Sequence, residues 1–121
     1  MRKKLGIIIA VLTVVLANSW VAAQVGPGHP DRGEALYKEH CLRCHGRMGE
    51  GDGPDAQGLI VRPVDFHTAR SRAKTDFELL IAISNGVLFS PMHSWRGRIA
   101  DEDMVHVIAY VRALAPEYPH L

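Results

Sequence analysis

Cys41-Leu42-Arg43-Cys44-His45 is the stretch that decides the fold of this chain. Cys41 and Cys44 lie about one helical turn apart, the spacing at which both thiols can add to the vinyl groups of a single porphyrin. The histidine that follows directly is then carried beneath the ring, with an imidazole nitrogen aimed at the iron. The chain has no other cysteine. The motif predicts covalent attachment of one c-type haem.

The alternatives for Cys41 and Cys44 are half of a zinc site, a disulfide or a redox-active pair. Structural zinc normally takes four ligands, and the chain has no second cysteine pair to supply them. A redox dithiol needs no adjacent histidine and usually lies near a βαβ pattern, which the sequence does not show. Haem attachment is the interpretation that uses both cysteines and the adjacent histidine.

The N-terminal residues 1–23 have the composition of a secretory signal peptide. A basic start, an apolar run and a small-residue site follow one another at residues 1–4, 5–17 and 21–23. The alternative is an uncleaved anchor, because residues 5–23 come close to the roughly 30 Å thickness of the hydrocarbon core. Asn18 and Ser19 interrupt this span and favour cleavage after Ala23. Both outcomes predict a periplasmic domain, with membrane contact only if the segment is retained.

The length and the net charge of the chain limit the number of domains and the kinds of partner that it can have. A chain of 121 residues is enough for one small domain. The sequence has 14 basic and 13 acidic side chains, and three of the basic ones lie in residues 1–23. Without that segment eleven basic and thirteen acidic side chains remain, a net charge of −2. Nucleic-acid binding would need a clustered basic face, so none is expected.

The segment before the motif predicts a flexible lead-in followed by a helix. Residues 24–30 contain two glycines and two prolines, and the domain proper is expected to span residues 31–121. Asp31 can cap a helix that runs from about Arg32 into the motif. Five glycines in residues 46–58 then predict a loop.

Two further helices are predicted from local signals. Thr75 and Glu78 form a capping box, and Gly86 provides a C-terminal stop. Residues 87–98 are expected to be irregular. Apolar residues at three- and four-residue steps predict a last helix over residues 101–114, with Asp101 as a possible cap.

Three helices with long loops predict an all-α fold. Loops of this length are unusual in a small domain unless they enclose something. An apolar porphyrin would supply part of the core in a chain whose size makes burial alone marginal.

Met92 is the candidate for the second axial ligand opposite His45. It lies 47 residues downstream of His45, after Pro91, in the loop expected to follow the second helix. A thioether is a weak donor that favours reduced iron, and the alternative role for a single methionine is in the core. The remaining histidines, apart from the one directly after Met92, are expected at the surface: His29, His40, His67, His106 and His120.

Taken together, these motifs resemble the class I cytochromes c, over roughly residues 31–114. The resemblance rests on Cys41–Gly46 with Gly49–Pro54, on Ile83–Val87 leading to Ser90–Met92, and on Ile108–Arg112. It implies a small cytochrome c fold of three main helices around one covalent haem c. Cys41 and Cys44 would hold the porphyrin, with His45 and Met92 on the iron.

The resemblance also implies how the helices meet and how the proximal histidine is oriented. The first and last helices would cross at Gly33, Tyr37 and Tyr110. A proline carbonyl, from Pro54 or Pro63, would accept a hydrogen bond from the proximal imidazole.

One departure from the family pattern concerns which residue is the second axial ligand of the iron. Members usually have a proline after the axial methionine, where this chain has His93. His93 is expected to point to solvent; the alternative is that it displaces Met92.

An iron with both axial positions filled changes oxidation state and binds no substrate. The expected function is that of a single-electron carrier, not an enzyme, docking transiently with a donor and an acceptor protein in the periplasm. The first alternative is the cytochrome subunit of a larger dehydrogenase or oxidase complex. The second is a haem enzyme or gas sensor with an open sixth position.

Overall fold

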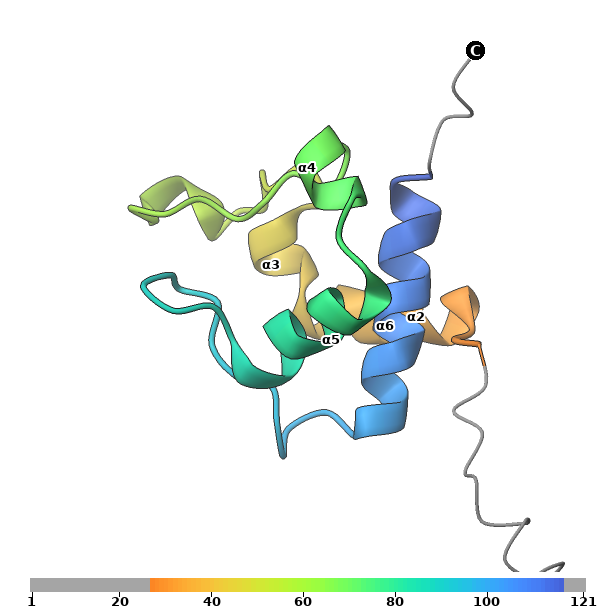
Figure 1. Cartoon of the computed structure of the whole chain (residues 1–121). Coiled ribbons are helices and arrows are strands. Elements are labelled where there is room, and N and C mark those ends of the chain that lie inside the picture. Colours follow the sequence, from red (N-terminus) through yellow and green to blue (C-terminus); the bar gives the residue numbers. More distant parts are fainter. Residues whose placement is uncertain (1–26, 117–121) are drawn as a thin grey trace, which may run out of the picture.

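The computed structural model describes residues 27–116, whose regular structure is helical (Figure 1). The elements are α2 (Pro30–His40), α3 (Leu42–His45), the 3-10 helix η2 (Ala56–Gly58), α4 (Ala69–Arg72), α5 (Asp76–Asn85) and α6 (Asp101–Leu114). Within these residues the only β-type pairing is an isolated bridge between Arg96 and Ile99, and no helix could cross a bilayer. The predicted all-α fold with three main helices is confirmed. The expected signal peptide or anchor, residues 1–23, lies outside the described residues.

Helix α2 differs from its prediction at both ends. It begins at Pro30 with His29 as N-cap, and no side chain caps it. Proline suits the first helical position because its φ is preset and it has no N–H to satisfy. Asp31 therefore lies inside the first turn, and its predicted capping role is wrong. The helix ends at His40 with Cys41 as its C-cap, so α2 and α3 are two helices where one was predicted.

Helix α6 has the predicted bounds but not the predicted cap. Ala100 is its N-cap and makes no side-chain hydrogen bond, so capping by Asp101 is wrong. Asp101, Glu102 and Asp103 all lie in the first turn. Carboxylates there interact favourably with the positive end of the helix dipole.

His106 on α6 is buried, against the expectation that it lies at the surface. Its exposed fraction is 9%, and its Nδ1 accepts a hydrogen bond of 2.9 Å from the backbone N–H of His29. The segment that precedes α2 covers this flank of α6, which helical periodicity alone does not reveal. The other histidines are distributed as follows: His29 is exposed, His40 and His67 are half-buried, and His120 lies outside the described residues.

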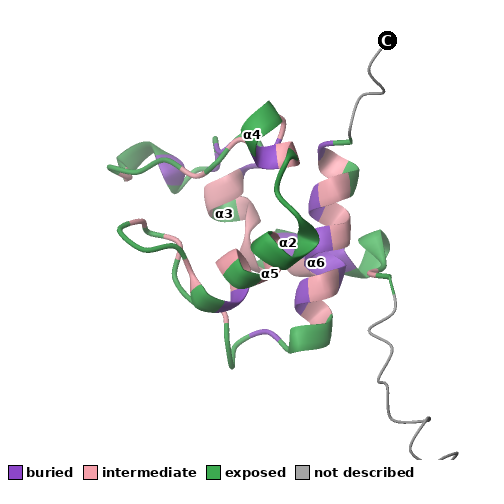
Figure 2. Ribbon diagram, viewed as in Figure 1, coloured by how far each residue is buried: buried purple, intermediate pink, exposed green. Residues whose placement is uncertain are grey.

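Helices α2 and α6 cross at the residues that the sequence predicted. A Cβ at Gly33 would overlap the carbonyl oxygen of His106, so glycine is what lets the two backbones approach. The rings of Tyr37 and Tyr110 lie 5.2 Å apart beside the crossing. Tyr37 is 1% exposed and donates a 2.7 Å hydrogen bond to the carbonyl of Gly46, just after α3. Figure 2 shows buried residues gathered at this crossing.

Helix α5 begins and ends where its local signals predicted. Both halves of the capping box are present: Thr75 accepts the N–H of Glu78, and Glu78 accepts the N–H of Thr75. Gly86 follows the helix with φ 75°, a conformation that favours glycine.

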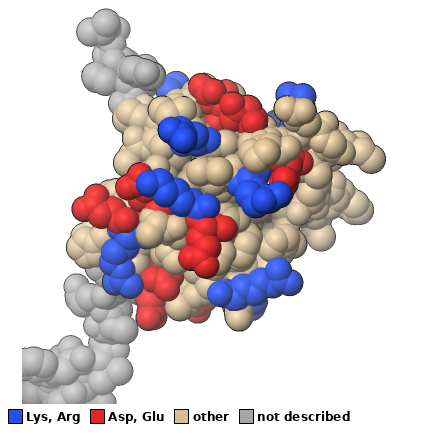
Figure 3. All heavy atoms as spheres, turned by 180° about the vertical axis from the view of Figure 1, so that it is seen from behind, with Lys and Arg blue, Asp and Glu red and all other residues tan. Residues whose placement is uncertain are grey.

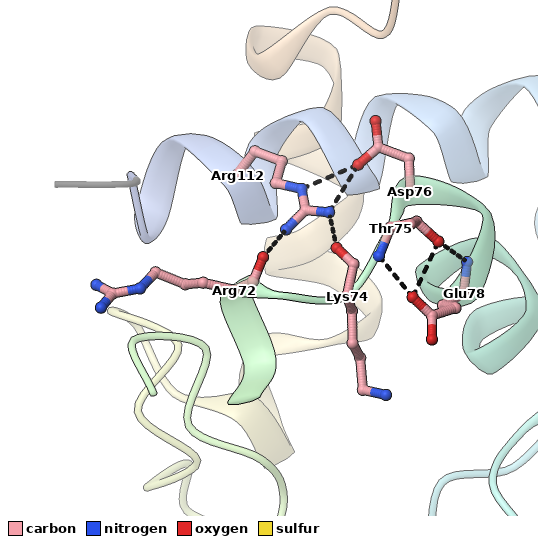
Figure 4. A network of polar contacts seen from close by, with 6 residues as sticks. All are labelled: Arg72, Lys74, Thr75, Asp76, Glu78 and Arg112. Carbon is pink, nitrogen blue, oxygen red and sulfur yellow. Dashed lines mark hydrogen bonds and ion pairs between the residues drawn. The ribbon is translucent and has the colours of Figure 1, made fainter. Parts of the chain in front are cut away.

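Arg112 ties α6 to the start of α5 (Figure 4). Its guanidinium donates to Asp76 Oδ1 at 2.9 Å and to the carbonyls of Arg72 and Lys74. One side chain thus fixes α5 against the α2–α6 pair.

Replacing Thr75 by alanine is expected to destabilise the folded domain by about 1 kcal/mol, because it removes the acceptor for a helix N–H. Thermal unfolding followed by far-UV circular dichroism measures the effect. Thr75→Ser keeps the hydroxyl and serves as the control. Equal melting temperatures for the Ala and Ser variants would contradict a contribution from the cap.

Two short elements were not predicted from the sequence. The 3-10 helix η2 falls within the glycine-rich stretch that was predicted as a loop, and α4 lies in a segment for which no element was predicted. Thr68 caps α4 by accepting the N–H of Ser71 at 3.2 Å. Helices of three or four residues carry too little periodicity to be predicted from sequence.

Charged side chains of both signs are interspersed on the face shown in Figure 3. Ion pairs join Arg32 to Asp103 at 3.2 Å and Lys38 to Glu34 at 2.8 Å. This face has no continuous basic surface of the kind that nucleic-acid binding requires.

Candidate functional site

The structure brings Cys41, Cys44 and His45 together around the short helix α3. The N–H of Cys41 donates to the carbonyl of Tyr37 at 2.8 Å and closes α2, while its own carbonyl accepts the N–H of His45 at 2.9 Å. Cys41 therefore occupies the junction of the two helices, and Cys44 and His45 follow one turn later. Both cysteines are free thiols and half-buried.

Cys41 has a neutral thiol in a buried position. Burial raises its pKa to about 12, and the neighbouring Cys44 adds to the increase. A thioether is also neutral, so it suits this position. Within residues 27–116 no group of three or more His, Cys, Asp and Glu side chains is placed to hold a metal ion.

The loop after α3 folds back and caps the helix. Amides of Gly51, Gly53 and Asp55 donate to the carbonyls of His45, Cys44 and Arg43, at 2.9, 3.2 and 2.8 Å respectively. Arg43 also forms a two-point ion pair with Asp55, with N–O distances of 2.7 and 2.8 Å. The carbonyls at the C-terminus of α3 are thus satisfied.

His45 has one ring nitrogen enclosed by protein. Its Nδ1 is buried and makes no hydrogen bond to any described residue, which leaves Nε2 as the nitrogen that can reach an iron. Burial lowers the pKa of His45, and the backbone carbonyl of Val64 acts in the opposite direction. The carbonyl of Val64 therefore lies close to the imidazole, although Nδ1 meets the full geometry of a hydrogen bond with no described residue.

The predicted proline acceptor for His45 is wrong. Val64 supplies the nearby carbonyl, one residue after Pro63. The carbonyl of Pro63 packs instead against Gly51, where a Cβ would overlap it. Pro54 lies exposed in a turn.

Phe66 contacts His45 from the far end of the same loop. The two rings are stacked, with centroids 5.0 Å apart and planes 14° from parallel. Phe66 is 9% exposed. Nothing in the local sequence pattern around Phe66 predicts this contact.

Met92 is carried by the loop after α5. Its carbonyl accepts the N–H of Val87 at 2.9 Å, and its own N–H donates to Ser90 Oγ at 3.2 Å. Farther along, the hydroxyl of Ser94 donates to the carbonyl of Ser84 at 2.6 Å and fastens the loop to α5. Met92 is half-buried within a loop of fixed shape.

His93 is exposed, as the sequence predicted. Its ring lies 4.6 Å from that of Trp95, and His40 lies 5.2 Å from Trp95. The ring of His93 therefore packs on Trp95 at the surface.

An apolar hollow lies between the two loops. Its volume is about 430 Å³, and residues 58–61 and 89–91 line it. Ile60 and Phe89, on opposite walls, are 102% and 95% exposed. Figure 1 shows both loops extending to the same side of the domain, with α3 between them.

These residues fit a haem. The hollow offers apolar walls to a flat apolar ring, both cysteines of the attachment motif are free thiols, and Nε2 is the nitrogen of His45 that remains to bind an iron. Exposed apolar side chains on facing walls indicate a binding site, since soluble domains rarely leave such surfaces uncovered.

Comparisons with known proteins agree with the geometry. The family model described as cytochrome c oxidase, cbb3-type, subunit III, matches residues 28–111. This range contains all the candidate site residues: Cys41, Cys44, His45 and Met92. No curated protein sequence matches the chain.

Two solved structures share the fold. A chain of the Kuenenia stuttgartiensis reducing HAO-like protein complex Kustc0457/Kustc0458 has a TM-score of 0.65 and 27% sequence identity. The match covers 77% of this chain and 49% of that one, so this chain spans about half its length. The KustC0563 c-type cytochrome has a TM-score of 0.56 and 23% identity, covering 69% of this chain and 96% of that one.

Proposed function

Because the chain belongs to the c-type cytochrome family described as cytochrome c oxidase, cbb3-type, subunit III, we propose that it carries single electrons between periplasmic redox proteins. The observation that carries the proposal is the placement of Cys41, Cys44 and His45 around one short helix, in a domain with an apolar hollow between its loops. The chain contains a single attachment motif, which supports one haem.

Each site residue has a distinct role in this proposal. A haem iron held by an imidazole and a thioether changes its oxidation state by one electron and needs no substrate. Cys41 and Cys44 anchor the group covalently, and His45 binds through Nε2. Met92 supplies the thioether from a loop that the hydrogen bond from Ser94 to the carbonyl of Ser84 fastens to α5.

The partners are proposed to be a donor and an acceptor protein that dock weakly and transiently, as in other redox encounters with small interfaces. A second candidate is a subunit of a larger redox complex. The similarity to a chain of the Kustc0457/Kustc0458 complex favours it. Co-purification with a larger protein would select the subunit role, and isolation as a diffusing monomer would select the free carrier.

The periplasmic location depends on residues 1–23, which we propose to be removed after Ala23. The intact mass of protein from a native host tests this directly. A mature chain beginning at Gln24 and carrying one haem would support the proposal, and an uncleaved chain would support the anchor.

The function is tested with protein from a host that attaches haem. We expect a long-wavelength methionine–iron band in the ferric form, a redox titration that fits one electron, and slow binding of carbon monoxide to the ferrous form. Rapid carbon monoxide binding without denaturant would contradict the proposal and support an open sixth position.

A further inference from the structure

The contact between His45 and Phe66 bears on how the proximal imidazole is oriented. The ring centroids lie 5.0 Å apart and the planes differ by 14°, so a flat face of Phe66 lies along His45. Aromatic pairs at such distances contribute free energy beyond the area that they bury. Rotation of the imidazole would break this parallel contact.

Phe66 is itself fixed by its surroundings. Its N–H donates to the carbonyl of Gly49 at 2.8 Å. Gly49 has φ 76°, and a Cβ there would lie 2.5 Å from the Phe66 ring, so the chain passes close against it. Phe66 also belongs to the core cluster with Val107 and Val111 of α6. The ring therefore has little freedom to follow a moving imidazole.

Nδ1 of His45 makes no hydrogen bond to residues 27–116 that would fix the orientation of the imidazole. A metal-bound histidine usually donates its second ring N–H to a protein acceptor, and this bond sets the ring orientation. Here Nδ1 is buried without a hydrogen-bond partner among residues 27–116. The stacked ring of Phe66 therefore constrains rotation, beside the nearby carbonyl of Val64.

We propose that Phe66 is a positioning residue that sets the rotation of the His45 imidazole, and with it the magnetic axes of the iron in the haem-loaded protein. This inference rests on the proposed function, because it requires His45 on the iron. The plane of an axial imidazole determines which iron orbital it overlaps, so a fixed plane gives one sharp electronic state. A rotating plane gives a distribution of states.

Three variants of the haem-loaded protein separate stacking from packing. Phe66→Leu keeps apolar volume and removes the flat face, whereas Phe66→Tyr keeps the flat face. Val111→Ala disturbs the same core cluster but keeps the Phe66 ring, and it is the control for lost stability. The readouts are the g values and line widths of the ferric electron paramagnetic resonance spectrum, and the spread of the haem-methyl NMR shifts.

We expect shifted and broadened g values and an altered haem-methyl pattern for Phe66→Leu alone. Wild-type spectra for Phe66→Leu, or equal changes in Phe66→Tyr or Val111→Ala, would overturn the inference. Should Phe66→Leu fail to take up haem, Phe66→Met is judged by the same criteria, because methionine fills irregular space without a flat face. A wild-type protein without a low-spin ferric signal would refute the proposed function instead, so the two failures are distinguishable.

Discussion

Haem-loaded protein in which Met92 is replaced by alanine is expected to lose the long-wavelength band of the ferric form completely. Alanine has no donor atom, and the loop that carries residue 92 is held by backbone hydrogen bonds that the substitution leaves in place. Loss of a thioether that favours reduced iron lowers the midpoint potential. We expect a decrease of roughly 0.1 V or more, a modest part of the range of about 0.8 V that axial ligands span. Absorption spectroscopy and a redox titration measure both effects.

Two matched variants show whether the loss is specific to Met92. Met48 is 51% exposed in the loop after α3, so Met48→Ala should keep the band and the potential. His93→Ala should also keep them, because His93 packs on Trp95 at the surface. Ferrous Met92→Ala protein should bind carbon monoxide rapidly. Survival of the band in Met92→Ala would show that another residue binds the iron, and its loss in His93→Ala would point to that histidine.

The parts of the fold that the sequence predicted are those with local causes. The capping box at Thr75 and Glu78 determines the start of α5 by contacts three residues apart. The bounds of α6 follow from an apolar repeat that continues for four turns. The start of α2 was missed because two local signals compete there. Pro30 occupies the first helical position, and Asp31 is thereby moved inside the helix.

The surroundings of His45 could not be predicted, because they depend on how a long loop closes. Phe66 reaches His45 only after its N–H pairs with Gly49, seventeen residues earlier. Resemblance to a family predicted a nearby carbonyl but assigned it to a proline. Whether Pro63 or Val64 faces the ring depends on backbone rotation in an irregular segment. The burial of His106 could not be predicted from local sequence either, because it results from contact with the chain segment before α2.

Replacing Gly33 by valine is expected to destabilise the domain strongly. A Cβ at this position would overlap the carbonyl oxygen of His106 and lie 2.9 Å from the Cβ of Tyr110. The overlapping atom belongs to the backbone of α6, so the two helices must move apart, and the core at their crossing opens. Overpacking typically lowers the free energy of unfolding by about 1–3 kcal/mol. We expect a loss at or above the upper limit for Gly33→Val, because the atom that valine would overlap belongs to the backbone. Such a loss is a large part of the roughly 5–15 kcal/mol that stabilises a domain.

Guanidinium unfolding of the haem-loaded proteins measures this effect, since a covalent cofactor stays attached in the unfolded chain. Stability should decrease in the order wild type, Gly33→Ala, Gly33→Val. In a solvent-exposed helix, replacing glycine by alanine would stabilise the helix by up to about 1 kcal/mol. A lower stability of Gly33→Ala would therefore isolate the steric effect. Ala35 is exposed on the same helix, and Ala35→Val should cost less than about 1 kcal/mol. Equal midpoints for Gly33→Val and Ala35→Val would show that the close crossing of α2 and α6 does not hold the domain together.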